Sequence, residues 1–364
     1  MAGNEQVMLL GGDLQIQRPD PESMFAHIAP VLREADFLFG NLEGVICEPM
    51  PTQAGHLVLR SDPEMLAAYK SAGFSVLGLG NHGTTSCGIE SLERCIEILD
   101  EAGIAHAGGG HDLNAAHKPA IIERGGTRVA FLAYSCLSER HFFATDESPG
   151  VAGIRVRTSY EFPPQASPGA MPIVHTDTNP EDLAVVREDV RQAKAQADIV
   201  VATWHWGIGP MRAGALAGKV MDYQKKLAHA AIDSGCDLVI GHHPHVLSGV
   251  EVYKGKAVFY SLGNFAFDYF ASPEKMATFY RGVARVRRNS FGMVRCLIKD
   301  KAIQEVSLLP LRIPDEDPRP VLLDTTQGRD IVELAQEVSE EFGAQLQPRE
   351  KDILVLETKA TATA

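Results

Sequence analysis

The sequence lacks several features that would assign it to common classes of protein. Its 364 residues include six cysteines, none of them in a Cys-x-x-Cys pair. No apolar run approaches the roughly 18 residues that a membrane-spanning helix requires. The N-terminal segment MAGNEQVMLLGGD lacks the basic and then apolar stretches of a secretory signal peptide. We therefore expect a cytoplasmic protein with no membrane association, whose thiols are reduced and mostly buried.

Positive charge is also in short supply. The chain has 34 Lys and Arg against 47 Asp and Glu, a formal net charge of −13. Such a surface repels phosphate backbones, which argues against nucleic acid or an anionic membrane as the main partner. Hydrophobic residues make up 45% of the chain, enough to build a sizeable core. The charge and composition of the chain therefore favour a soluble enzyme with a small-molecule partner.

The sequence does contain apolar strand-like runs that alternate with amphipathic helical segments. Strands are predicted at residues 6–13, 36–46, 74–82, 128–135, 198–207 and 236–245, and helices at 22–35, 62–73, 88–103, 181–197, 222–235 and 329–343. This alternation is typical of an α/β fold. Three further segments, 256–265, 292–301 and 302–311, read as consecutive strands of a meander or second sheet.

The whole chain, residues 1–364, is predicted to form one domain. Residues 139–180 lack periodicity and are rich in Pro, Gly and aromatic residues, so we predict an insert that acts as a lid over the site. A plain solvent-exposed excursion explains the same composition. Residues 325–364 are predicted to form a C-terminal helix and tail.

Polar residues of metal-ligand type follow five of the predicted strands. These residues are Asp13, Asn41, Glu43, Asn81, His82, His205, His242, His243 and His245. Ligands of open α/β sheets bind beyond the carboxyl ends of the strands, so the five segments should converge on one site. Each residue alone has an ordinary explanation, such as a turn, a cap or a core histidine. Their joint occurrence favours a site for a divalent ion such as Mn, Fe or Zn, because those ions accept imidazole and carboxylate together.

The same segments carry a family resemblance. The motifs GGD at 11–13, NLEG at 41–44, GNH at 80–82, HWG at 205–207, GHHPH at 241–245 and YSLGNF at 260–265 occur in order. In this pattern the chain is similar to the CapA-like branch of the calcineurin-like metallophosphoesterase superfamily, named for capsule and poly-γ-glutamate synthesis. The resemblance implies a four-layer α/β fold, with two β-sheets packed face to face and flanked by helices.

The resemblance also implies roles for individual residues. The metal ligands it implies are Asp13, Glu43 as a bridging carboxylate, Asn81, His205 and two histidines of the His242, His243 and His245 cluster. We assign these two as His243 and His245, although the sequence does not decide which of the three face the site. His82 resembles a general acid, and Asp13, Glu43 and His243 join it in the expected catalytic set. Asn264 and Tyr260 of the YSLGNF motif are expected to contact substrate. Arg281, in a nearby arginine-rich segment, is expected to bind an anionic group, although a solvated strand face would also explain those arginines.

The chain departs from the superfamily pattern at three motifs. The first motif reads Asp13-Leu14-Gln15 where Asp-x-His is usual, and the second has Asn41 where an Asp is usual. The segment after His82 offers Thr85 and Ser86 where CapA-like chains usually have an Asp. Each departure removes a ligand or a negative charge, so the site is predicted to hold two ions, one ion or none.

Three functions are compatible with this sequence. The first is a metal-dependent hydrolase that acts on a small or peptide-like anionic substrate, through either a phosphoester or a γ-glutamyl or other amide bond. The second is a metal-independent peptide epimerase that uses Asp or Glu and His as an acid–base pair at Cα. The third is a non-enzymatic component of capsule or poly-γ-glutamate assembly. The sequence leaves the oligomeric state open.

Overall fold

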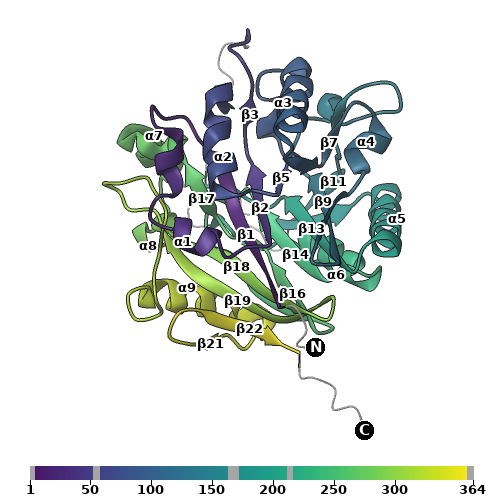
Figure 1. Cartoon of the computed structure of the whole chain (residues 1–364). Helices are drawn as coiled ribbons and strands as arrows, with labels where there is room; N and C mark the ends of the chain where they lie inside the picture. The colour runs from purple at the N-terminus through teal and green to yellow at the C-terminus, as the bar shows by residue number, and fades with distance from the viewer. Residues whose placement is uncertain (1–4, 52–57, 163–171, 211–215, 359–364) are drawn as a thin grey trace.

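A computed structural model describes residues 5–51, 58–162, 172–210 and 216–358. Two large β-sheets form the centre of the molecule, and helices cover their outer faces (Figure 1). The α/β architecture with two sheets packed face to face, expected from the family resemblance, is confirmed.

The larger sheet has ten strands and combines the start and the end of the chain. Its strands are β1 (Gln6–Gln15), β2 (Phe37–Leu42), β5 (Val76–Gly78), β6 (Ala105–Ala107), β17 (Asn264–Phe267), β18 (Ser290–Lys299), β19 (Ala302–Arg312), β20 (Val321–Leu322), β21 (Gln347–Pro348) and β22 (Ile353–Glu357). Strands β1, β2, β5 and β6 pair in parallel, and β18 pairs antiparallel with β1. The carboxyl ends of β1, β2 and β5 therefore lie at one edge.

The smaller sheet has six strands. They are β8 (Ala120–Arg124), β9 (Thr127–Ser135), β13 (Ile199–His205), β14 (Leu238–His242), β15 (Val250–Tyr253) and β16 (Lys256–Phe259). Strands β9, β13, β14 and β16 are parallel neighbours. Because β13 and β14 are in register at His205 and His242, their histidines emerge side by side.

The two-residue period of the strands divides their apolar side chains between two layers. In the larger sheet, Met8 and Val76 point inward to the layer between the sheets, where they join Phe131 and Ile240 of the smaller sheet. Their neighbour Leu77 points outward. Strands buried on both faces explain why these segments read as nearly continuous hydrophobic runs.

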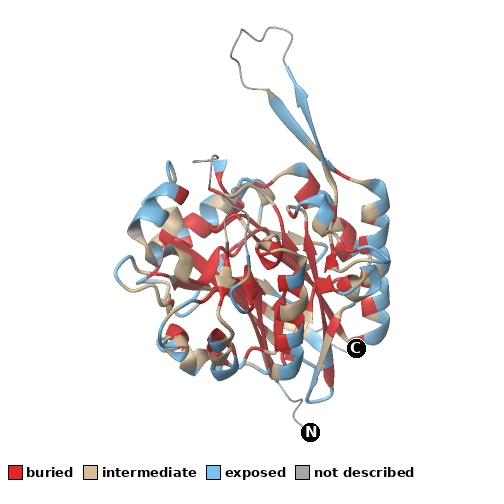
Figure 2. Ribbon diagram, turned by 90° about the horizontal axis from the view of Figure 1, so that it is seen from above, coloured by how far each residue is buried: buried red, intermediate tan, exposed pale blue. Residues whose placement is uncertain are grey.

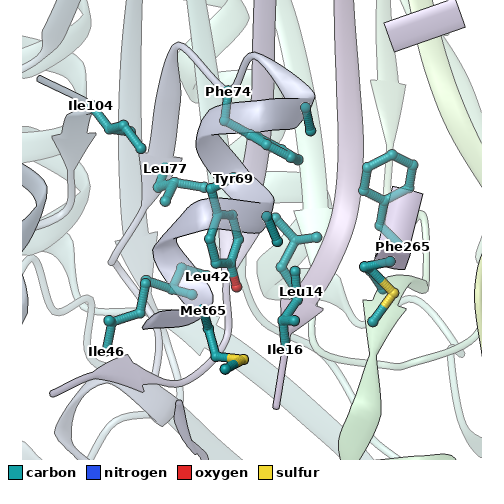
Figure 3. Packing of buried hydrophobic residues seen from close by; sticks show 14 of the residues in the cluster. Leu14, Ile16, Leu42, Ile46, Met65, Tyr69, Phe74, Leu77, Ile104 and Phe265 are labelled. Carbon is teal, nitrogen blue, oxygen red and sulfur yellow. The ribbon is translucent and has the colours of Figure 1, made fainter. Parts of the chain in front are cut away.

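Helices bury the outer faces of both sheets. On the larger sheet, Tyr69 and Phe74 of the segment around α2 (Leu66–Ala72) pack with Leu14, Leu42 and Leu77, as Figure 3 shows; α3 (Ile89–Ala102) covers the same cluster. On the smaller sheet, α5 (Pro180–Gln196) and α6 (Asp222–Asp233) pack over β9, β13 and β14.

Shorter elements complete the chain. They are α1 (Ala29–Leu32), α4 (Leu113–His117), α7 (Pro273–Phe279), α8 (Arg285–Asn289), α9 (Arg329–Ser339), β3 (Val45–Ile46), β4 (Arg60–Ser61), β7 (Gly109–Gly110) and β10 (Gly150–Val151), together with 3-10 turns at Pro21–Phe25, Pro63–Met65, Gly83–Thr85, Arg140–Phe142, Asp268–Ala271 and Glu340–Phe342. Within the described parts of the chain, no helix is both long and apolar enough to span a bilayer.

Three predicted elements differ in the structure. The expected helix at 22–35 is broken into a 3-10 turn and the short α1, which begins just before Pro30, a residue that cannot donate a helical hydrogen bond. The expected strand at 256–265 is two strands: β16 belongs to the smaller sheet and β17 to the larger one. The expected C-terminal tail supplies β21 and β22, which extend the larger sheet beyond β19.

The segment predicted as a lid contains a β-hairpin. Strands β11 (Val156–Glu161) and β12 (Ile173–Thr178) pair antiparallel, and Figure 2 shows them projecting away from the body of the molecule. Residues 163–171 lie outside the described residues. A role as a lid stays a prediction.

Candidate functional site

The carboxyl ends of strands from both sheets bring the predicted polar residues together. Asp13 lies in β1, in register with Asn41 at the end of β2 and with Asn264 at the start of β17. His205 ends β13, and His242 ends β14 beside it. The site predicted at the strand ends is therefore assembled across the junction of the two sheets.

Asp13 occupies the floor of this site and is fully buried. Its Oδ1 accepts a hydrogen bond from Asn41 Nδ2 at 2.7 Å, and its Oδ2 accepts one from the His243 backbone N–H at 3.1 Å. These two bonds tie the first motif of the chain to the histidine cluster of the smaller sheet.

Glu43 lies directly after β2 and is also buried, with 1% of its surface exposed. His245 Nε2 is 3.3 Å from Glu43 Oε1, yet neither Glu43 oxygen has a hydrogen-bond partner of good geometry among the described residues. His205 Nε2 and His82 Nε2 approach the same Oε1 at 3.6 and 3.8 Å. A buried carboxylate needs positive charge beside it, which a protonated His245 or a bound cation supplies here.

Among the described residues, two groups of side chains have ligand atoms close enough to hold a metal ion. One consists of Glu43, His82, His205 and His243, and the other of Asp13, Glu43 and His245; within each group all ligand atoms lie within 4.8 Å of one another. Glu43 belongs to both groups. Imidazole and carboxylate donors in this mixture fit Mn, Fe or Zn, and the shared glutamate fits a bridge between two ions.

The amide of Asn41 sets the proton positions on two histidines. Its NH2 group faces His205 Nδ1 at 3.4 Å, so that nitrogen accepts and the proton of neutral His205 is on Nε2. In the metal-free protein, His205 Nε2 then donates to His82 Nδ1 at 2.8 Å, and an ion bound through Nε2 would displace that proton. The remaining proton of neutral His82 is on Nε2, the nitrogen that faces Glu43.

The three histidines of the GHHPH motif have different surroundings. His243 and His245 both adopt positive φ, 92° and 51°, which is uncommon for residues other than glycine and concentrates at functional sites. Their rings turn into the two ligand groups. His242 lies behind Asp13 with Nδ1 3.6 Å from Oδ1, its ring packed 6.0 Å from that of Phe39, and belongs to neither group.

Asn81, expected to be a ligand, is placed at the site but is used by the protein itself. Its Oδ1 accepts hydrogen bonds from the backbone N–H groups of Gly83 and Thr84, and its Nδ2 donates to Leu42 O and Asn41 Oδ1. These bonds hold the turn that carries His82 against the end of β2.

The three expected substrate-contacting residues differ in position. Asn264 is in the site, where its Oδ1 contacts His245 Nδ1 at 2.7 Å. The structure does not bring Tyr260 or Arg281 there. The Tyr260 side chain points to the outer layer, where its hydroxyl donates to Glu251, and Arg281 is exposed after α7. Strand alternation around residue 260 turns Tyr260 outward, which explains the first difference.

Sequence reasoning missed one residue of the site. The hydroxyl of Tyr280 accepts a hydrogen bond from Asn264 Nδ2 at 2.8 Å and donates one to the backbone carbonyl of His245 at 3.0 Å. In the sequence, Tyr280 follows a short helix and lies in none of the strand-end motifs, so neither a motif nor periodicity indicates it.

Burial and charge shift the acid–base properties of these groups. Burial, followed by the charge of Glu43, raises the pKa of Asp13 to about 8. Burial alone would lower the pKa of His245, but the Glu43 and Asp13 carboxylates outweigh it and raise that pKa to about 9. Burial lowers the pKa of His242 to about 3 and holds that of His205 well below its usual value. Without metal, Asp13 and His245 therefore hold protons at neutral pH.

Comparison with known proteins agrees with these motifs. The sequence profile of the family described as bacterial capsule synthesis protein PGA_cap matches residues 6–269. Among curated proteins, the PGA biosynthesis protein CapA of Bacillus subtilis is 27% identical over 314 residues, 85% of this chain and 70% of that protein. The capsule biosynthesis protein CapA of Bacillus anthracis is 27% identical over 329 residues, 89% of this chain and 69% of that protein.

Solved structures include similar chains at low identity. The NAD nucleotidase of Haemophilus influenzae has a TM-score of 0.41 and 11% sequence identity, over 93% of this chain and 56% of that one. The profile match covers most of the chain and all six motifs that build the site. The chain therefore belongs to the bacterial capsule synthesis protein PGA_cap family.

Proposed function

We propose that this protein is a metal-dependent hydrolase that cleaves a phosphoester or a γ-glutamyl or other amide bond in a small or peptide-like anionic substrate. The observation that carries the proposal is the position of Glu43, a buried carboxylate that belongs to both ligand groups and whose oxygens make no well-formed hydrogen bond among the described residues. A divalent ion bound there would lower the pKa of a water molecule and offset the negative charge that develops during hydrolysis.

The residues around Glu43 have separable roles in this proposal. Asp13, His205, His243 and His245 hold the ions together with Glu43. His82 has 34% of its side chain accessible, far more than Glu43, His205 or His245. In its imidazolium form it would face an incoming substrate and transfer the proton that the leaving group requires.

The proposed substrate class is based on the relatives of this chain. Relatives of this chain are named for PGA and capsule biosynthesis, which supports an anionic, peptide-like substrate. The superfamily resemblance supports a phosphoester instead. Both bond types are therefore included in the assay below.

The test combines metal analysis with a matched pair of variants. Tag-free protein is analysed by elemental mass spectrometry, beside Glu43→Gln and the control Glu251→Gln. Glu251 is also a partly buried carboxylate near a histidine, but its oxygens accept hydrogen bonds from Tyr260 and His229 away from the site. We expect wild type and Glu251→Gln to bind Mn, Fe or Zn, and Glu43→Gln to lose it.

Hydrolysis is then assayed with chromogenic phosphoesters and a γ-glutamyl anilide. Activity in wild type and Glu251→Gln but not in Glu43→Gln would support the proposal. A folded wild-type protein that neither contains nor takes up metal would overturn it. Exchange of a substrate Cα proton with solvent deuterium by that metal-free protein would then identify an epimerase.

A further inference from the structure

Tyr280 reaches the candidate metal site from a part of the chain outside the family match. It follows α7, beyond the matched residues 6–269, and is 3% exposed. Its hydroxyl lies between two groups that hold His245, the Asn264 side chain and the His245 carbonyl. Tyr280, Asn264 and His245 thus form a closed ring of hydrogen bonds behind one ligand.

The backbone carbonyl of His245 determines the direction of every hydrogen bond in this ring. A backbone carbonyl can only accept, so the Tyr280 hydroxyl uses its single proton on His245 O. The hydroxyl oxygen must then accept from Asn264, which fixes the NH2 end of that amide toward Tyr280. Asn264 Oδ1 therefore faces His245 Nδ1, so Nδ1 carries a proton.

Protonation of Nδ1 determines the state of the other ring nitrogen of His245, Nε2. With Nδ1 protonated, the lone pair of a neutral His245 is on Nε2, 3.3 Å from Glu43 Oε1 and inside the Asp13–Glu43–His245 group. Phe267 and Phe279 pack nearly perpendicular to the His245 ring, with centroids 5.1 Å away in both cases, but apolar rings cannot select a tautomer. Hydrogen bonding must do so.

We infer that Tyr280 is a positioning residue that, through Asn264, fixes the tautomer and orientation of His245 so that Nε2 serves as the metal ligand. The inference rests on the proposed metal-dependent function and deepens it. Outer hydrogen bonds of this kind orient ligating histidines, and their loss typically weakens metal affinity about 10–100-fold.

The test compares Tyr280→Phe with Tyr134→Phe. Both substitutions keep a buried ring and remove one hydroxyl; that of Tyr134 donates to Asp189, in the outer layer of the smaller sheet. Metal affinity is measured by competition with a chromophoric chelator. We expect Tyr280→Phe to bind the ion of the Asp13–Glu43–His245 group about 10–100-fold less tightly, and Tyr134→Phe to match wild type. Asn264→Ala should show the same loss and Asn264→Asp, which keeps an acceptor toward Nδ1, a smaller one.

A second readout does not require metal. Long-range 15N–1H spectra of the imidazoles report which nitrogen of His245 carries the proton. We expect a protonated Nδ1 in wild type and a mixture of tautomers in Tyr280→Phe at a pH where the ring is neutral. Unchanged affinity and an unchanged His245 spectrum in Tyr280→Phe and Asn264→Ala would overturn the inference. A wild type that binds no metal but shows the expected tautomer change would overturn the proposed function and leave Tyr280 as the residue that positions His245.

Discussion

The imidazole of His245 and the carboxylate of Glu43 meet with Nε2 3.3 Å from Oε1, and both side chains are buried. Glu43 follows β2 of the larger sheet, whereas His245 follows β14 of the smaller one. A neutral imidazole lone pair facing a carboxylate is repulsive, so a cation must lie between them. A proton supplies it in the free protein, and a metal ion would take its place in the proposed enzyme.

Replacement of one histidine at a time should separate the two ligand groups. His243→Ala removes a donor from the Glu43–His82–His205–His243 group, and His245→Ala removes one from the Asp13–Glu43–His245 group. We expect each variant to lose one ion and keep the other, measured by elemental analysis after dialysis. His229→Ala, which alters a histidine paired with Glu251, is the control and should keep both. Loss of all metal in both variants would indicate a single shared ion.

Metal binding should release protons at neutral pH and strengthen as pH rises. The raised pKa values of Asp13, about 8, and His245, about 9, mean that both groups hold a proton at pH 7 in the free protein. An ion must displace these protons, so affinity should rise with pH and level off above about 9.

Calorimetry in two buffers of different ionisation enthalpy measures this release. We expect about two protons per chain at pH 7 and progressively fewer as the pH passes through the two pKa values. Affinity that does not change between neutral and alkaline pH would show that Asp13 and His245 are not ligands.

Much of this site was predictable because its residues follow strands. An apolar run that ends in Asp13, Glu43 or His205 places that residue at the carboxyl end of a strand, and parallel strands bring such ends together. The same reasoning located His243 and His245 but could not separate them from His242. That distinction depends on the positive φ of the turn, which no residue pattern encodes.

Other features depend on contacts between distant segments. The step from β16 to β17 carries the chain from one sheet to the other at residues 260–263, just after the alternation of β16 has turned Tyr260 to the outer layer. Tyr280 enters the site from the segment after α7, where the sequence shows no signal. Periodicity predicts which residues share a face, but it does not predict which element will cover that face.

Gly12 should be indispensable where β1 passes the segment that crosses between the sheets at residues 260–263. A Cβ at this position would lie 1.9 Å from the Gly263 carbonyl oxygen, which accepts the Asp13 backbone N–H at 2.9 Å. We expect Gly12→Ala to lower the free energy of unfolding by about 1–3 kcal/mol or more, because the backbone must shift.

Gly73→Ala is the matched control for Gly12→Ala. Gly73 has a positive φ of 86° but open space around its Cβ position, so the substitution should cost about 1–2 kcal/mol through backbone strain alone. Chemical denaturation measures both changes. Only Gly12→Ala displaces Asp13, so only that variant should also bind metal more weakly; equal metal affinity in the two variants would contradict the role of this crossing in placing Asp13.

His82 should matter more for turnover than for metal retention. Its side chain is 34% exposed, whereas those of Glu43 and His205 are 1% exposed, so it lies where substrate would enter. His82→Asn leaves Glu43, His205 and His243 to hold the ion, and we expect most of the metal to remain. Loss of a proton-transfer group should lower kcat about 10²–10⁴-fold on a substrate with a poor leaving group. A substrate whose leaving group needs no proton should be hydrolysed at nearly the wild-type rate, which separates proton transfer from loss of the ion.

His229→Asn, at 32% exposure, alters a similarly accessible histidine outside the site and should leave both rates unchanged. If His82→Asn instead loses metal and activity in parallel on both substrates, His82 is a ligand and the proton comes from another group.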